Sequence, residues 1–222
     1  TTAGSESGGI VFDGKSGTVY GNVTLQEDIT IGEGESLTIG QDASLNTGSH
    51  EVIVNGGTLN GADKITGTVK YAPTITTQPT SQTVTEGETA TFTVVTSGTE
   101  PLSYQWQQST DSGQSWTDID GATDATYTTE ATTTSMNGYQ YRCVVSNSAG
   151  SGESNAAILT VNAKPTYTIT AESSPAEGGT VTVNGGTSSV SVEANSTVNL
   201  VATPNAGYRF TGWTSSNEDV TF

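Results

Sequence analysis

His50 is the one histidine in the sequence, so chemistry that needs an imidazole would have to use it. Ser49 and Glu51 flank it, which supplies the residue types of a hydrolytic triad. Adjacent residues of a strand face opposite sides of a sheet, however, so three consecutive residues do not converge on one substrate. The sequence also lacks a Gly-x-Ser-x-Gly turn and a P-loop. We therefore expect no catalytic residue and interpret His50 as a surface residue in a turn.

Acidic residues gather between Asp118 and Asp124, with Asp120 between them. Clustered carboxylates suit hard cations such as calcium. The loop lacks the regular spacing and the terminal glutamate of an EF-hand, so we expect a solvated turn and no bound metal. Paired carboxylates for glycoside hydrolysis stay open as an alternative among the 23 acidic residues, although that chemistry needs a cleft that small β-sandwiches seldom form alone.

The segment Ser109–Trp116 has the spacing Ser-x-Asp-x-Gly-x-x-Trp. It resembles the Asp box of sialidases and related proteins, a hairpin in which the aspartate accepts backbone N–H groups and the tryptophan packs beneath. A short carboxylate suits this role, and glycine permits the positive φ that such a turn needs. We expect Asp111 to stabilise a turn and not to catalyse a reaction.

Three aromatic residues, Trp116, Tyr208 and Trp213, are candidates for stacking on a sugar ring. Each also has a structural explanation, in hairpin or core packing, and solvent exposure would decide between the two. No other side chains are proposed as binding residues, and no cofactor is expected.

The composition limits the partners. The 222 residues carry six basic and 23 acidic side chains, a net charge of −17, which disfavours nucleic acid and anionic membranes. No apolar run approaches the ~20 residues of a membrane helix, so no membrane insertion is expected. One cysteine and one histidine exclude a disulfide framework and a Cys/His zinc site. A monomer that contacts a host or bacterial surface protein or glycan is consistent with these limits.

Short strands must position these residues, because apolar residues alternate with threonine and no segment shows helical periodicity. Pro73 and Pro165 mark linkers and divide the chain into three predicted modules, 1–72, 73–162 and 163–222. In the first module, alternating triplets predict strand pairs that recur about every 14–15 residues. This pattern favours a short β-solenoid, with a meander of hairpins as the alternative, and it is similar to solenoid-like modules of bacterial surface proteins. The triplets are Val23–Leu25, Ile29–Ile31, Leu37–Ile39, Ala43–Leu45, Val52–Val54 and Thr58–Asn60.

The short strands of the second module, with turn signals every ~8–12 residues, predict a β-sandwich of six or seven strands. The module contains Trp106 and, further along, Tyr141 two residues before Cys143. With these residues it resembles bacterial immunoglobulin-like domains. The resemblance implies that Trp106 is the buried tryptophan of strand C and that Tyr141, two residues before Cys143, forms the tyrosine corner of strand F. The partner cysteine of strand B is replaced, by Val94, so the resemblance implies that Cys143 is a buried free thiol beside Trp106.

The third module ends in Gly207-Tyr208-Arg209-Phe210-Thr211-Gly212-Trp213. This run resembles the divergent internalin-B-type repeat of bacterial surface proteins. The alternation places Tyr208, Phe210 and Trp213 against one core. Such repeats continue for one or two strands after the tryptophan, so the resemblance implies that the repeat is truncated at Phe222.

Together these observations predict an all-β chain of three modules in series: a β-solenoid-like module, an immunoglobulin-like sandwich and a small β-rich repeat. The expected function is that of a non-enzymatic, extracellular stalk or adhesin segment of a bacterial surface or secreted protein. The alternative is a carbohydrate-binding accessory region of a secreted polysaccharide-active enzyme.

Overall fold

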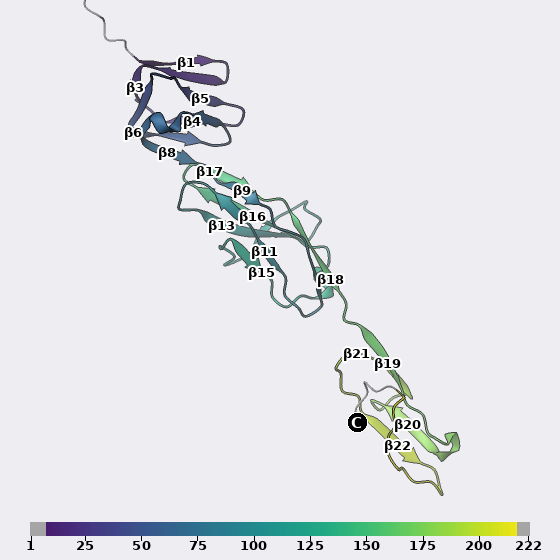
Figure 1. The fold of residues 1–222 in the computed structure, drawn as a ribbon. Coiled ribbons are helices and arrows are strands. Elements are labelled where there is room, and N and C mark those ends of the chain that lie inside the picture. The colour runs from purple at the N-terminus through teal and green to yellow at the C-terminus, as the bar shows by residue number, and fades with distance from the viewer. Residues whose placement is uncertain (1–7, 217–222) are drawn as a thin grey trace, which may run out of the picture. The chain divides into compact units, whose positions relative to one another are not determined.

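The computed structural model describes residues 8–216, and these are almost entirely β-structure (Figure 1). The chain divides into two compact units, residues 1–162 and residues 163–222. The first unit contains a stack of parallel coils followed by a β-sandwich, and the second contains two small sheets. None of the helices in residues 8–216 is long and apolar enough to cross a membrane. The three helices are single 3-10 turns, η1 (Ala62–Lys64), η2 (Thr134–Met136) and η3 (Ala176–Gly178).

Residues 16–71, called the coil stack below, wind through strands that pair in parallel with the next coil. One sheet has the order β1-β2-β5-β7, in which β1 (Gly9–Asp13) is an antiparallel edge strand. The other sheet joins β3, β4 and β8 to the long strand β6, which serves two faces of the stack. The coil strands are β2 (Ser16–Tyr20), β3 (Asn22–Thr24), β4 (Ile29–Ile31), β5 (Ser36–Ile39), β6 (Ser44–Val54), β7 (Thr58–Asn60) and β8 (Ile65–Tyr71).

The predicted repeat period of 14–15 residues is wrong. Ser16 pairs with Ser36, and Ser36 pairs with Thr58, so one coil takes 20–22 residues and holds three strand segments instead of two. The period was misjudged because of the corners, where two strands of the same coil meet. Gly21, at φ +62°, is the single residue between β2 and β3. In the sequence, so short a corner has the same spacing as the point where one coil ends and the next begins. The parallel pairing of successive coils also excludes a simple meander of hairpins.

Aliphatic side chains fill the inside of the coil stack because equivalent positions of successive coils lie over one another. Val23, Leu45 and Ile65 form one such column, since Leu45 is the Cα partner of both neighbours. Leu45 and Val52 are fully buried. Each coil therefore covers the apolar face of the next, which is how short strands acquire a core without a second layer.

Residues 74–162 form an immunoglobulin-like β-sandwich. Its larger sheet has the order β10-β18-β16-β13-β14, with β17 also paired to β16, and β10 runs parallel to β18. Across from it lie the pairs β11–β15 and β12–β9. The strands are β9 (Thr74–Thr77), β10 (Gln82–Thr85), β11 (Thr91–Thr93), β12 (Val95–Ser97), β13 (Ser103–Ser109), β14 (Thr117–Asp118), β15 (Thr126–Thr128), β16 (Gln140–Asn147), β17 (Gly150–Glu153) and β18 (Ala157–Asn162).

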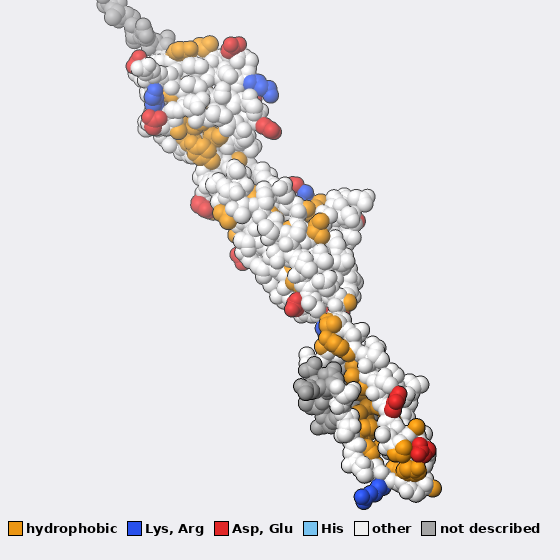
Figure 2. Space-filling model, turned by 45° about the vertical axis from the view of Figure 1, so that its right-hand side comes forward, with side chains coloured by type: hydrophobic (Ala, Val, Ile, Leu, Met, Phe, Trp, Pro, Cys, Tyr) orange, Lys and Arg blue, Asp and Glu red, His pale blue; other side chains and the backbone are white. Residues whose placement is uncertain are grey.

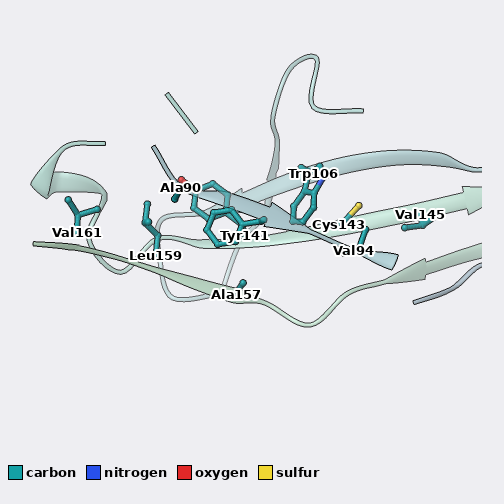
Figure 3. Packing of buried hydrophobic residues seen from close by; sticks show 10 residues of the cluster. Ala90, Val94, Trp106, Tyr141, Cys143, Val145, Ala157, Leu159 and Val161 are labelled. Carbon is teal, nitrogen blue, oxygen red and sulfur yellow. The ribbon is translucent and has the colours of Figure 1, made fainter. Parts of the chain in front are cut away.

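The sandwich core follows the two-residue period of its strands. On β16 the inward positions are Tyr141, Cys143 and Val145, all fully buried, while the residues between them are partly exposed. Trp106 on β13 lies opposite Cys143 in the register, and Figure 3 shows the two side chains next to each other in the core. The predicted β-sandwich is confirmed, although its described residues form ten strand segments, β9 to β18, instead of six or seven.

The second unit has two antiparallel pairs, β19–β21 and β20–β22. Its described residues bury Ala171 and Val183, whereas several larger apolar side chains stay at the surface (Figure 2). Tyr167 is 55% exposed and Val201 is 44% exposed. The described part of this unit is therefore thinly packed. Its strands are β19 (Thr166–Thr170), β20 (Gly179–Val183), β21 (Ser189–Glu193) and β22 (Leu200–Pro204).

Candidate functional site

The Asp-box segment forms a closed hydrogen-bonded turn after β13. Asp111 Oδ1 accepts hydrogen bonds from the backbone N–H of Ser115 at 2.9 Å and from Ser109 Oγ at 2.7 Å, and Oδ2 accepts one from Ser115 Oγ. The Gly113 N–H donates to Ser109 Oγ at 2.8 Å, with Gly113 at φ +87°. The hydrogen bonds from Ser115 and Ser109 lower the pKa of Asp111 to about 2. The carboxylate is thus held ionised by its own turn.

Trp116, the last residue of this motif, packs under a fixed arginine. The Arg142 guanidinium lies 4.5 Å from the centre of the Trp116 ring, in a cation–π arrangement. Two partners hold that guanidinium: Gln107 Oε1 accepts from Nε at 2.7 Å, and Glu153 Oε2 lies 2.6 Å from an Nη. Trp116 is half-buried, and one of its faces is already occupied. A sugar ring would have to use the other face or displace Arg142.

The structure agrees with the immunoglobulin-like pattern at Cys143 and departs from it at Tyr141. Cys143 is a buried free cysteine beside Trp106, as the resemblance implied, and burial raises the pKa of its thiol to about 11. Tyr141 stacks on Phe92 at a centroid distance of 4.8 Å. Its buried hydroxyl has no hydrogen-bond partner among residues 8–216, so it does not make the backbone bond that defines a tyrosine corner. That expectation is corrected: Tyr141 acts through its ring.

His50 lies within β6 and not in a turn, which corrects the sequence interpretation. Its Nδ1 is 3.4 Å from Asp28 Oδ1, whereas the neighbouring Glu51 carboxylate contacts Lys70 Nζ at 2.7 Å. The strand continues past Gly48, where φ is +60°, and its pairing with β8 is interrupted up to Glu51. This local bend makes the segment look like a turn in sequence. The residues around His50 therefore point to different partners and form no triad.

Two of the aspartates in residues 118–124 contact different neighbours. Asp118 accepts a hydrogen bond from Gln107 Nε2 at 2.8 Å, and the backbone carbonyl of Asp124 accepts from Trp106 Nε1 at 2.9 Å. Across the described part of the chain, no three His, Cys, Asp or Glu side chains lie close enough to hold a metal ion. This loop has the geometry of a turn, with Gly121 at φ +72°.

Tyr208 and Trp213 are brought together in the second unit, far along the chain from Trp116. Both line a cavity of about 530 Å³ that also includes Phe210, whose ring centre is 4.9 Å from that of Trp213. Tyr208 is 43% exposed and Phe210 is 49% exposed. The predicted packing of these aromatics against one core is therefore only partial among the described residues. The strands implied after Trp213 fall mostly on residues 217–222, outside the described residues.

A larger cavity lies where the coil stack meets the sandwich, and sequence reasoning did not identify it. Its volume is about 750 Å³, and its walls come from the last coil, the β8–β9 connection, the loop after β12 and the start of β17. These four segments are distant in sequence, so no local motif marks the site. The residues that give it chemical character are Asn55, Thr58, Tyr71, Thr74, Ser97 and Ser151.

Comparison with known families assigns two parts of the chain. Residues 65–163 match a family described as a domain of unknown function (DUF8696). Residues 167–221 match the divergent InlB B-repeat domain, which confirms the resemblance for the last module. The first match begins at the first residue of β8, so it includes the last strand of the coil stack together with the sandwich.

One curated relative is Endoglucanase C of Cellulomonas fimi, which is 43% identical over 93 residues. That alignment covers 42% of this chain and 8% of the endoglucanase, so the chain spans less than a tenth of that protein. Among solved structures, Sidekick-1 immunoglobulin domains 1–5 share 22% identity at a TM-score of 0.36, covering 46% of this chain and 21% of that one. A chimeric titin Z1Z2 shares 32% identity at a TM-score of 0.34, covering 43% and 98%.

Proposed function

We propose that this chain is a non-catalytic, extracellular segment of a bacterial surface or secreted protein and that it serves as a stalk or adhesin segment. The match of residues 167–221 to a divergent InlB B-repeat supports this setting. The acidic, threonine-rich composition supports it as well, because such a surface stays soluble and resists non-specific association.

The observation that carries the proposal is the joint between the coil stack and the sandwich. Only Ala72 and Pro73 separate β8 from β9. The Tyr71 N–H donates to Thr99 Oγ1 at 2.8 Å, and the Tyr71 carbonyl accepts from the Thr99 N–H at 3.0 Å and from Asn147 Nδ2 at 2.8 Å. Asn147 also donates to the Thr99 carbonyl at 2.8 Å. A strand end fixed by three hydrogen bonds transmits position and load from one module to the next, which is what a stalk requires.

Force spectroscopy on the full chain, held at its two ends, tests this role. If the chain is a load-bearing stalk, its modules should unfold in discrete steps. The first should come from residues 163–222, since their described part is thinly packed. At about 3.3–3.6 Å per residue, these residues reach roughly 200 Å when fully extended, so this step should lengthen the tether by that length minus the end-to-end span of the folded unit. A gradual extension of residues 1–162 below that force would contradict the proposal, because the joint would then yield before the modules unfold.

The similarity to Endoglucanase C favours a second candidate, an accessory region of a secreted polysaccharide-active enzyme. This role predicts that the chain is retained on an insoluble polysaccharide. If exposed aromatics are responsible, Trp213→Ala should reduce retention more than Trp116→Ala, because Arg142 already covers one face of Trp116. If both variants are retained as strongly as the parent chain, these aromatics do not bind the polysaccharide.

A further inference from the structure

We propose that the cavity between the coil stack and the sandwich binds a neutral oligosaccharide. This site goes beyond the stalk role, because it gives the joint a ligand of its own. The volume of about 750 Å³ is within the range of small-molecule sites, which is roughly 300–1,000 Å³. The walls come from both modules, so a bound molecule would contact the end of the coil stack and the sandwich at once.

The lining has the chemistry of a site for an uncharged polyol. Although the chain carries a net charge of −17, no acidic or basic side chain among residues 8–216 lines the cavity. Amide and hydroxyl groups face it, and among the described residues the side chains of Asn55, Thr58, Thr74, Ser97 and Ser151 make no hydrogen bond to another protein group. Hydrogen-bond donors and acceptors are therefore both available to the hydroxyl groups of a sugar.

An apolar surface completes the site. Val54, Leu59 and Pro73 contribute to its walls, and Tyr71, which also lines it, is 41% exposed. Sugars present C–H faces that pack on such surfaces. A tyrosine ring packs on a C–H face, and its hydroxyl forms hydrogen bonds with the hydroxyl groups of a sugar. Hydrogen bonds with Thr99 and Asn147 fix the Tyr71 backbone, so the strand end that carries the ring is in place before a ligand arrives. A phosphate or carboxylate ligand would find no cation here.

The test is calorimetric titration of the full chain with cellotetraose, xylotetraose and mannotetraose, and with tetragalacturonate as the charged comparison. We expect saturable binding of at least one neutral tetrasaccharide and none of tetragalacturonate. Tyr71→Ala should weaken binding by about tenfold, whereas Tyr71→Phe, which keeps the ring, should stay within about threefold. Ser97→Trp fills the cavity and should abolish binding. Thr160→Trp, which adds the same side chain on the exposed face of β18, should leave it unchanged.

Amide chemical shifts of the same samples locate the ligand. Changes at Thr58, Ser97 and Ser151 on addition of the neutral tetrasaccharide would support the site. Changes confined to residues 208–213 would overturn it and move binding to the second unit. Absence of binding by all three neutral tetrasaccharides at millimolar concentration, with folding of the chain verified by the same spectra, would also overturn it.

Discussion

Trp106 joins the two sheets of the sandwich by both its ring and its nitrogen. It is fully buried, its ring centre lies 6.3 Å from that of Phe92 and 6.1 Å from that of Tyr127, and it donates Nε1–H to the Asp124 carbonyl at 2.9 Å. Trp106→Ala should therefore lower the free energy of unfolding by about 3–5 kcal/mol, from the lost burial and the cavity left behind. Chemical denaturation followed by circular dichroism measures this. A midpoint equal to that of the parent chain would show that the ring does not pack as described.

Tyr141 provides the opposite case, a buried polar atom with no partner. Its hydroxyl is unpaired among the described residues, and burial raises the pKa of the phenol above its ordinary value. Tyr141→Phe removes the hydroxyl and keeps the ring that stacks on Phe92. The free energy of unfolding should stay the same or rise by about 1 kcal/mol, because an unpaired buried group is costly. A loss above about 1 kcal/mol would mean that the hydroxyl has a partner in solution.

Asp111 gives the chain a local dependence on pH. Its pKa is lower in the folded turn, about 2, than its ordinary value of 3.8, so the ionised form favours the folded turn. The stabilisation is complete above pH ~4 and is lost as the pH falls toward 2. A carbon-detected NMR titration should give a midpoint near 2 for Asp111. Ser115→Ala, which removes one of the hydrogen bonds from Ser115, should move the midpoint toward 3.8, and an unchanged midpoint would contradict this cause.

Gly67 shows at the element scale why the coils can stack so closely. It lies within β8 at φ +114°, and a Cβ atom there would overlap the Thr47 side chain, which is fully buried and accepts a hydrogen bond from the Thr68 N–H. Gly67→Ala should therefore destabilise the coil stack by roughly 1–3 kcal/mol, through both strain and overlap. Thermal unfolding measures the change.

The matched control for this prediction is Gly9→Ala on the edge strand β1. A Cβ atom at Gly9 meets nothing within 4 Å, and its φ is outside the left-handed region, so the change should be within about 0.5 kcal/mol. Equal effects at the two glycines would contradict the close packing between β6 and β8.

The elements that could be predicted are those whose pattern is local. The resemblance to immunoglobulin-like domains implied the buried positions of Trp106 and Cys143, and the Ser-x-Asp-x-Gly-x-x-Trp spacing identified the turn of Asp111. The coil period could not be predicted, because a one-residue corner at Gly21 leaves the same spacing as a coil closure. The junction cavity could not be predicted either, since it depends on how Tyr71, Thr99 and Asn147 meet across long stretches of sequence.

At the scale of the whole molecule, the account rests on the joint within residues 1–162. Three hydrogen bonds join Tyr71, at the end of the coil stack, to Thr99 and Asn147 of the sandwich. A fourth, from Asn147 to the Thr99 carbonyl, lies within the sandwich. If these bonds persist in solution, the two modules keep one mutual arrangement, as both the stalk role and the proposed saccharide site require. If they break readily, Ala72 and Pro73 would act as a hinge.

The most direct test is a pulsed electron-spin distance measurement between labels at Asp42→Cys and Asp120→Cys, exposed positions of the coil stack and the sandwich. The native Cys143 is fully buried and its thiol pKa is raised to about 11, so only the introduced cysteines should react. The account predicts a single narrow distance distribution for the parent chain and a broader one for Asn147→Ala. A distribution that is already broad in the parent chain, and unchanged by Asn147→Ala, would contradict it.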